Sequence, residues 1–126
     1  MTNKITQDSF LDAATNGLLD VVRESLQKQL CDVDWQNERG WTALMKSARH
    51  CQKDVANILI SHKCNLDLQC NNGWTALMLA AEKGHKDIVD ALIAHNSNPY
   101  LQNNNGQTAQ IIAAYIRVTR MLSRHY

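Results

Sequence analysis

The side chains that could do chemistry are a few histidines and cysteines in the middle of the chain. His50 and Cys51 are adjacent, and a nucleophilic cysteine needs an imidazole close to its thiol. Neighbouring residues at a helix end point in different directions, however, and nothing obvious orients this imidazole. We interpret the pair as part of a loop between two helices. The sequence also has no glycine-rich phosphate loop and no nucleophile elbow, so we predict no catalytic residue and no enzyme.

A second group, made of His62, Cys64 and Cys70, contains the residue types that bind metal ions. Their spacing fits none of the usual zinc patterns, and Cys64 is better explained as a core residue. We therefore predict no metal site and no cofactor. The four cysteines are typical of reduced thiols inside a cell.

The histidines and cysteines lie within a chain that contains an internal sequence repeat. The stretch at residues 73–85 reads GWTALMLAAEKGH, and partial copies begin 33 residues earlier, at Gly40, and 33 residues later, at Gly106. A fixed period of this length is typical of a stacked repeat array. Asn-Gly dipeptides at Gly73 and Gly106 predict tight turns, because glycine accepts a positive φ without a Cβ clash.

The stretch resembles the ankyrin repeat, whose pattern is Gly-x-Thr-Pro-Leu-His-x-Ala-Ala-x-x-Gly-His. The matching residues are Gly73, Thr75, Leu77, Ala80, Ala81, Gly84 and His85, while Ala76 and Met78 replace the Pro and the His. The resemblance covers nearly the whole chain. It implies an all-α solenoid of stacked helix-turn-helix units with β-turn fingers. We expect one complete domain over residues 1–126, with an N-terminal cap at about 6–36, repeats at 37–69 and 70–102, and a C-terminal cap at 103–126.

Several local signals locate the helices. Thr6 or Asp8 is expected to cap the first helix, which should end at Gly17, and Thr42 should cap the first helix of unit two. Asp20, Asp54 and Asp87 should begin the second helices, where a carboxylate meets the positive end of the helix dipole.

Glycines that the family uses at helix ends are replaced in this chain. Cys51 stands at the end of one first helix, and Leu30, Lys63 and Asn96 are expected at the left-handed ends of the second helices. Unit one has one extra residue, which we place between Val22 and Cys31. We expect Cys31 and Cys64 to share a register as buried residues that are too far apart for a disulfide.

The fourth unit departs most from the pattern. Arg117 stands in place of the glycine between the two helices, and Gln110 in place of a core leucine. We expect its inward apolar face to consist of Ile111, Ile112, Met121 and Leu122, and its last helix to be short.

Charge is unevenly distributed along the chain. The net charge is +1, but residues 1–38 carry seven acids and three bases, a net of −4, and residues 39–126 carry five acids and ten bases, a net of +5. No apolar run approaches the ~20 residues that span a bilayer, and the N-terminus lacks a signal-peptide core. We expect no membrane partner and a monomer inside the cell, in the cytoplasm, with a nuclear protein or a secreted effector left open.

Three tryptophans are the most informative aromatic residues. Trp41 and Trp74 each follow a turn glycine, and the resemblance places them on the finger flank facing the concave groove. Tryptophan is enriched among interface hot spots, so they could anchor a partner. They could also pack on each other and on neighbouring turns, and the two interpretations are compatible. Trp35, at the position of Leu68 and Leu101, is expected to pack at a finger base.

The resemblance also implies which positions would contact a partner. In unit two they are Glu38, Arg39, Trp41, Arg49 and His50. In unit three they are Asn71, Asn72, Trp74, Glu82 and Lys83, and in unit four Asn104, Asn105, Gln107 and Tyr115. His85 resembles a structural residue that bonds to loop backbone.

This surface is aromatic at its centre and mixed in charge, which suits a protein or peptide. We predict a non-enzymatic protein–protein interaction module, an adaptor or inhibitor, that binds through the concave groove and finger tips. The alternative is nucleic-acid or nucleotide binding through the basic C-terminal end and an exposed tryptophan. It is less favoured, because the groove lacks the dense Lys/Arg stripe that phosphate backbones require.

Overall fold

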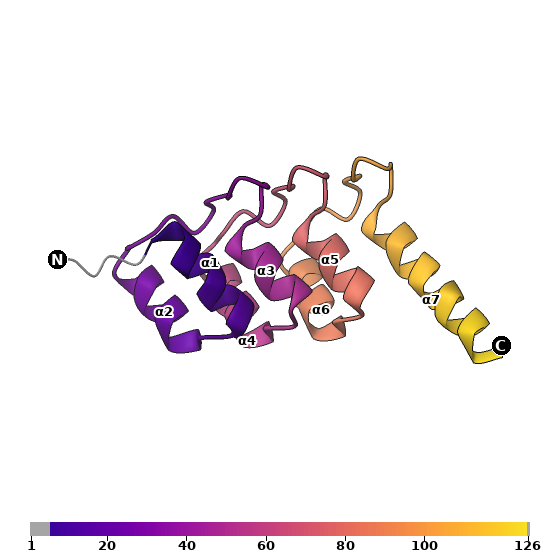
Figure 1. The fold of residues 1–126 in the computed structure, drawn as a ribbon, viewed down its shortest axis with the longest axis horizontal. Coiled ribbons are helices and arrows are strands. Elements are labelled where there is room, and N and C mark those ends of the chain that lie inside the picture. Colours follow the sequence, from indigo (N-terminus) through magenta and orange to yellow (C-terminus); the bar gives the residue numbers. More distant parts are fainter. Residues whose placement is uncertain (1–5, 126) are drawn as a thin grey trace.

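The structure, a computed structural model, describes residues 6–125, and the side chains of all of these except 118 and 121–125. Within this range the chain forms helices and no β-strand. The helices are α1 (Gln7–Asn16), α2 (Leu19–Gln27), α3 (Ala43–Arg49), α4 (Lys53–Ser61), α5 (Ala76–Lys83), α6 (Lys86–Ala94) and α7 (Ala109–His125). Figure 1 shows three successive helix pairs followed by α7 alone, with looped fingers projecting along one edge. The predicted all-α solenoid is therefore confirmed.

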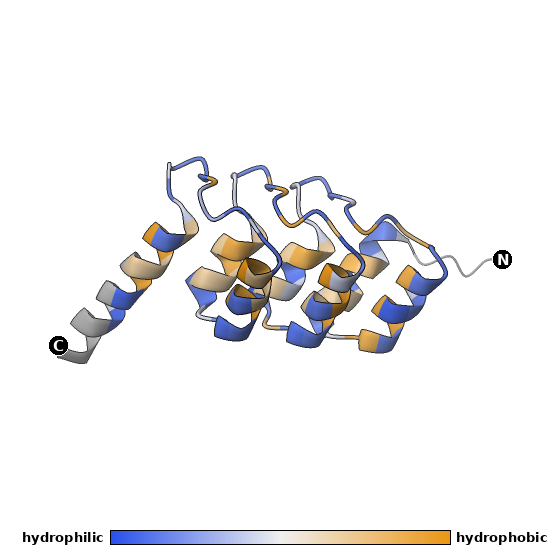
Figure 2. Ribbon diagram, turned by 180° about the vertical axis from the view of Figure 1, so that it is seen from behind, coloured by the Kyte–Doolittle hydropathy of each residue, from blue (hydrophilic) through white to orange (hydrophobic). Residues whose placement is uncertain are grey.

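The helices form two layers. The first layer contains α1, α3, α5 and α7, each packed against the next, and the second contains α2, α4 and α6 (Figure 1). Figure 2 shows that hydrophobic residues alternate with hydrophilic ones along the helices of both layers. The buried core contains residues of both layers, and those exposed by less than 2% include Phe10, Met45, Met78, Leu59 and Leu92. The contacts between layers place one continuous core along the stack. None of the described helices is both long and apolar enough to cross a membrane.

Threonines begin the first helices. The Oγ1 atoms of Thr6, Thr42 and Thr75 accept hydrogen bonds from backbone amides three residues on, at 3.0, 3.2 and 3.2 Å. Each such cap stabilises its helix by about 1 kcal/mol, because it satisfies an amide that has no partner within the helix. The expectation at Thr42 is confirmed, and of the two candidates at the first helix Thr6 is the cap, whereas Asp8 lies in the first turn. Asp20, Asp54 and Asp87 lie in the first turns of the second helices, as predicted.

The fingers are connected to one another by hydrogen bonds. The amide nitrogen of Asn71 donates to the carbonyl of Arg39 at 2.9 Å, and its side-chain Nδ2 donates to the carbonyl of Glu38 at 2.9 Å. Asn104 repeats both bonds one finger later, to Asn72 and Asn71, each at 3.0 Å. These bonds therefore fix the spacing of the fingers and of the side chains on them.

The helix ends correct one prediction. Gln29, Lys63 and Asn96 have positive φ values of 54°, 59° and 69°, so Gln29 and not Leu30 adopts the left-handed conformation after α2. The expectations for Lys63 and Asn96 are confirmed. Cys51, with φ 57°, likewise occupies a turn that glycine forms in units one and three, at Gly17 and Gly84.

The inserted residue is Cys31. The amide of Leu30 donates to Ser25 O, just as Cys64 donates to Leu59 O and Ser97 to Leu92 O, so Leu30 is the structural equivalent of Cys64. The expectation that Cys31 and Cys64 share a register is wrong. Cys64 is buried and Cys31 only partly so. The insertion lies in the loop because there it removes no hydrogen bond from the nine-residue helix α2.

The fourth unit also differs from expectation. It forms one continuous helix, α7, of 17 residues that passes straight through Arg117. The physical reason is the missing glycine, since arginine favours helix over a left-handed turn. Ile112 is 4% exposed, as predicted, but Ile111 is 50% exposed and does not face inward. The side chains of Met121 and Leu122 lie outside the described residues.

Candidate protein-binding groove

Trp41 and Trp74 lie at one pocket between units two and three. The pocket has a volume of about 150 Å³, and we call it the tryptophan pocket. Its lining residues are Trp41, Arg49, Cys70, Asn72, Trp74, Leu79 and Glu82. Two consecutive fingers thus place their indoles on one concavity, with α3 and α5 supplying its floor. Both rings are half-buried and pack against the core, so each presents only part of its surface to solvent.

Two cations rest on the ring of Trp41. Lys46 Nζ lies 4.9 Å from the ring centroid, and the Arg49 guanidinium carbon lies 5.8 Å from it. Such contacts contribute about 0.5–1 kcal/mol each at exposed sites, because the negative face of the ring attracts the charge. They hold the indole in place against α3.

Lys46 is a groove residue that the sequence reasoning missed. Its signal was its position three residues before Arg49, since residues spaced by three lie on the same face of a helix. Leu79, in the equivalent position of α5, was not among the predicted groove positions either. It is 3% exposed and forms part of the pocket wall.

Positive charge gathers where α3 ends. Loss of hydration lowers the pKa of His50, and the charges of Arg49, Lys46, Lys83 and His85 lower it further. The imidazole is therefore held neutral at pH values where a free histidine begins to protonate. His50 itself ends α3 and Cys51 forms the turn after it.

His85 bridges two units, as predicted for a structural residue. Its Nε2 lies 3.2 Å from the carbonyl oxygen of Arg49, to which it donates, across the junction between units two and three. This bond holds the end of α3 in place, and therefore also the backbone position from which the Arg49 side chain extends.

The predicted finger-tip residues divide into two kinds. Asn71 and Asn104 use their side-chain amides on the neighbouring finger, and Gln107 Oε1 accepts a bond from Asn103 Nδ2 at 2.9 Å. Their polar groups are thus engaged within the chain. The residues whose exposed side chains project from the tips are Glu38, Arg39, Asn72 and Asn105.

The remaining predicted positions lie away from the tryptophan pocket. Lys83 is exposed at the end of α5, and Tyr115 is 65% exposed on α7. Trp35 packs against the core, as do Leu68 and Leu101. It also lines a separate pocket of about 290 Å³ with Asp8, Asn37, Glu38 and Arg39.

The basic C-terminal end has two arginines with described side chains. Arg117 and Arg120 are both exposed on α7, and the Arg120 guanidinium approaches Gly84 at the end of α5. Arg124 lies outside the described side chains. Across the described part of the chain, no cluster of three or more His, Cys, Asp or Glu could hold a metal ion.

The cysteines give a prediction about reactivity. Burial raises the pKa of Cys64 to about 12, and burial together with Asp32 raises the pKa of Cys31 to about 11, whereas Cys51 is exposed. The thiolate is the reactive form, so at pH 8 iodoacetamide should alkylate Cys51 at least roughly tenfold faster than Cys31 or Cys64. Mass spectrometry of peptides after short pulses measures this. Equal rates at Cys51 and Cys64 would contradict it, and labelling in urea is the control.

Two layers of short helices with hydrogen-bonded fingers define a helical repeat solenoid. The comparison with protein families makes the assignment specific: the family described as ankyrin repeats (3 copies) matches residues 10–103. The chain belongs to the ankyrin repeat family. Ankyrin repeats are in general protein–protein interaction modules and are typically non-enzymatic. No curated protein matches the chain.

Proposed function

We propose that this chain is a non-enzymatic adaptor or inhibitor that binds a protein partner through the tryptophan pocket and the exposed finger tips. The observation that carries the proposal is the convergence of Trp41 and Trp74 on one pocket. Large aromatic side chains that are half-buried beside a cavity can bury their remaining surface against a partner, and such residues dominate binding energies. We further propose that the protein is a monomer and that it acts inside the cell. Its free thiols support the intracellular location, because the interior of a cell keeps thiols reduced.

The test begins with a partner captured from the source lysate and then purified. Trp74→Ala should weaken its binding by about 2 kcal/mol or more, which is the range of an aromatic hot spot. Calorimetry measures the affinity, and urea unfolding measures the stability of the same variant. The matched control is Asp90→Ala, an exposed residue of α6 in the second layer, which should leave affinity unchanged.

Two outcomes would count against the proposal. If Trp41→Ala and Trp74→Ala both bind the partner as tightly as wild type, the pocket is not the interface. If the variants lose stability but not affinity, the tryptophans are structural only. The alternative, nucleic-acid binding at Arg117 and Arg120 of α7, predicts a steep fall of affinity with salt for a DNA or RNA oligonucleotide.

A further inference from the structure

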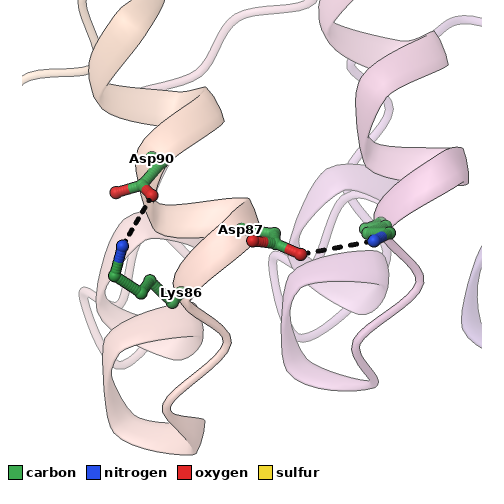
Figure 3. Close-up of polar contacts among 4 residues, drawn as sticks. Lys86, Asp87 and Asp90 are labelled. Atoms are coloured by element: carbon green, nitrogen blue, oxygen red, sulfur yellow. Dashed lines mark hydrogen bonds and ion pairs between the residues drawn. The ribbon is translucent and has the colours of Figure 1, made fainter.

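The ion pairs of the described residues all lie in the second layer. In α2, Asp20 pairs with Arg23 at 3.6 Å, and Glu24 pairs at 2.9 Å with Lys28, the residue that follows the helix. The other two pairs involve α6, where Lys86 pairs with Asp90 and Asp87 with Lys53 of α4, each at 3.3 Å. Figure 3 shows these two pairs, one within α6 and one from α6 to α4. On this face, eight charged side chains are thus paired with an opposite charge.

The groove side is different. Lys46, Arg49 and Lys83 have no carboxylate within 4 Å among the described side chains. Lys46 and Arg49 rest instead on the Trp41 ring. Loss of hydration lowers the pKa of the nearby His50, and the charges of Arg49, Lys46 and Lys83 lower it further, in agreement with this geometry. The Arg49 guanidinium, 5.8 Å from the ring centroid, has no ion-pair partner among the described side chains, and its planar set of N–H donors matches the two oxygens of a carboxylate.

The positive charge is confined to a short stretch of the groove. The positions equivalent to Lys46 are Asp12 in unit one, Leu79 in unit three and Ile112 in unit four. Asp12 is exposed on α1, which packs directly against α3. A long acidic tract crossing both units would meet this like charge. The charge pattern favours a ligand with only one or two carboxylates beside an apolar group.

We propose that the partner segment in the tryptophan pocket is a short acidic peptide motif. An apolar side chain of this motif packs against Trp41 and Trp74, and an Asp or Glu carboxylate binds Arg49 and Lys46. The inference rests on the proposed function, since it names the chemistry of the partner that the tryptophan pocket receives. The tryptophans supply contact area, and Lys46 and Arg49 attract the carboxylate of the motif. This carboxylate lies on the Trp41 side of the pocket, away from Glu82, which also lines it.

The test uses random 12-residue peptides displayed on phage and selected against the full chain. Synthetic copies of the selected peptides are then measured by fluorescence anisotropy. We expect enrichment of Asp and Glu next to an apolar residue, and at least a tenfold loss of affinity in the Lys46→Gln/Arg49→Gln variant. Replacing the peptide's carboxylates with amides should cost the wild type a similar factor and cost this variant little. That non-additivity identifies a direct contact between the two groups.

A matched control removes the same charge from the other face. Lys53→Gln/Lys86→Gln also loses two cations, but from the second layer, so it should bind the acidic peptide within about twofold of wild type. Thermal unfolding of both variants shows whether each remains folded. Equal losses in the two double variants would mean that net charge, and not the groove, attracts the peptide, which overturns the proposal.

Other outcomes separate this inference from the proposed function. Peptides that depend on Trp74 but show no acidic enrichment would overturn the inference and leave the binding module intact. Peptides whose binding ignores both tryptophans would overturn the proposed function as well. Two further results would overturn the acidic-peptide motif. One is salt-sensitive self-association that Lys46→Gln/Arg49→Gln abolishes, measured by sedimentation. The other is an oligonucleotide that binds more tightly than any selected peptide and loses affinity in the same variant.

Discussion

Replacing Gly73 with alanine is expected to destabilise the protein by about 3 kcal/mol, measured by urea unfolding. The residue has a φ of +82°, a conformation that costs an L-residue about 1–2 kcal/mol. An added Cβ would also lie 2.8 Å from the Cα of Asn103 and 2.8 Å from the amide nitrogen of Asn104. Both atoms belong to backbone, so the next finger must move away. The hydrogen bond from Asn104 N to Asn72 O then weakens, with a typical net loss of about 1 kcal/mol.

Gly106 provides the control for this substitution. Its φ of +74° is nearly the same, but an added Cβ would meet no heavy atom of the described residues within 4 Å, apart from its two chain neighbours. Gly106→Ala is therefore destabilised only by the positive φ. The reduced entropy of the unfolded chain partly offsets this, so the expected net loss in the free energy of unfolding is about 1 kcal/mol. The difference between the two variants measures the packing of one finger on the next. Equal losses would show that the fingers do not support one another.

The finger packing also bears on binding, because Gly73 immediately precedes Trp74. The contact of the added Cβ pushes the two fingers apart, and the part of this shift that the Gly73 finger takes up displaces Trp74, which lines the tryptophan pocket. We expect Gly73→Ala to weaken partner binding as well as folding, and to weaken binding more than Gly106→Ala does, since Gly106 belongs to the finger of unit four, which does not line the tryptophan pocket.

Much of the fold could be predicted because single residues act locally. A threonine at a helix start and a glycine at a turn each do the same thing wherever they recur, as Thr42, Thr75, Gly17 and Gly84 show. These residues satisfy backbone groups or adopt conformations that other side chains resist. Their effect does not depend on distant contacts, so a repeat pattern transfers it from one unit to the next.

The predictions that were wrong concern register and helix face, which depend on the backbone hydrogen bonds of the folded chain. Cys31 and Cys64 are spaced by the repeat length, and a shared residue type made them look equivalent. The hydrogen bonds instead align Leu30 with Cys64, because α2 keeps its full length and the loop takes up the insertion. Ile111 and Ile112 differ by one position, which turns a side chain by about 100° around a helix axis. An apolar pair alone does not show which member faces inward.

The position of the two groove tryptophans could be predicted from the sequence, but the pairing of the charged side chains around them could not. Trp41 and Trp74 stand at equivalent positions of the repeat, so their common orientation followed from the pattern. The contact of Lys46 with Trp41 did not, since the two residues are five apart across the junction of finger and helix. Whether the neighbouring cations had acidic partners also depended on tertiary structure, because Glu82 lines the same pocket as Arg49 without forming an ion pair.

Leu92→Ala should be the most damaging core substitution in the second layer of unit three, with an expected loss of about 3 kcal/mol in the free energy of unfolding. Leu92 is 0% exposed in α6, and removing buried leucine atoms loses their transfer energy and leaves a cavity. The adjacent Ile93 is the control, since it belongs to the same helix but is 54% exposed, so Ile93→Ala should cost less than about 1 kcal/mol. Urea unfolding followed by circular dichroism measures both.

The shape of the unfolding transition should change as well. In a repeat array stability is nearly a sum over units and their interfaces, so the Leu92→Ala transition should broaden as units three and four open before units one and two. A loss at Ile93 as large as that at Leu92 would contradict the burial on which the expectation rests.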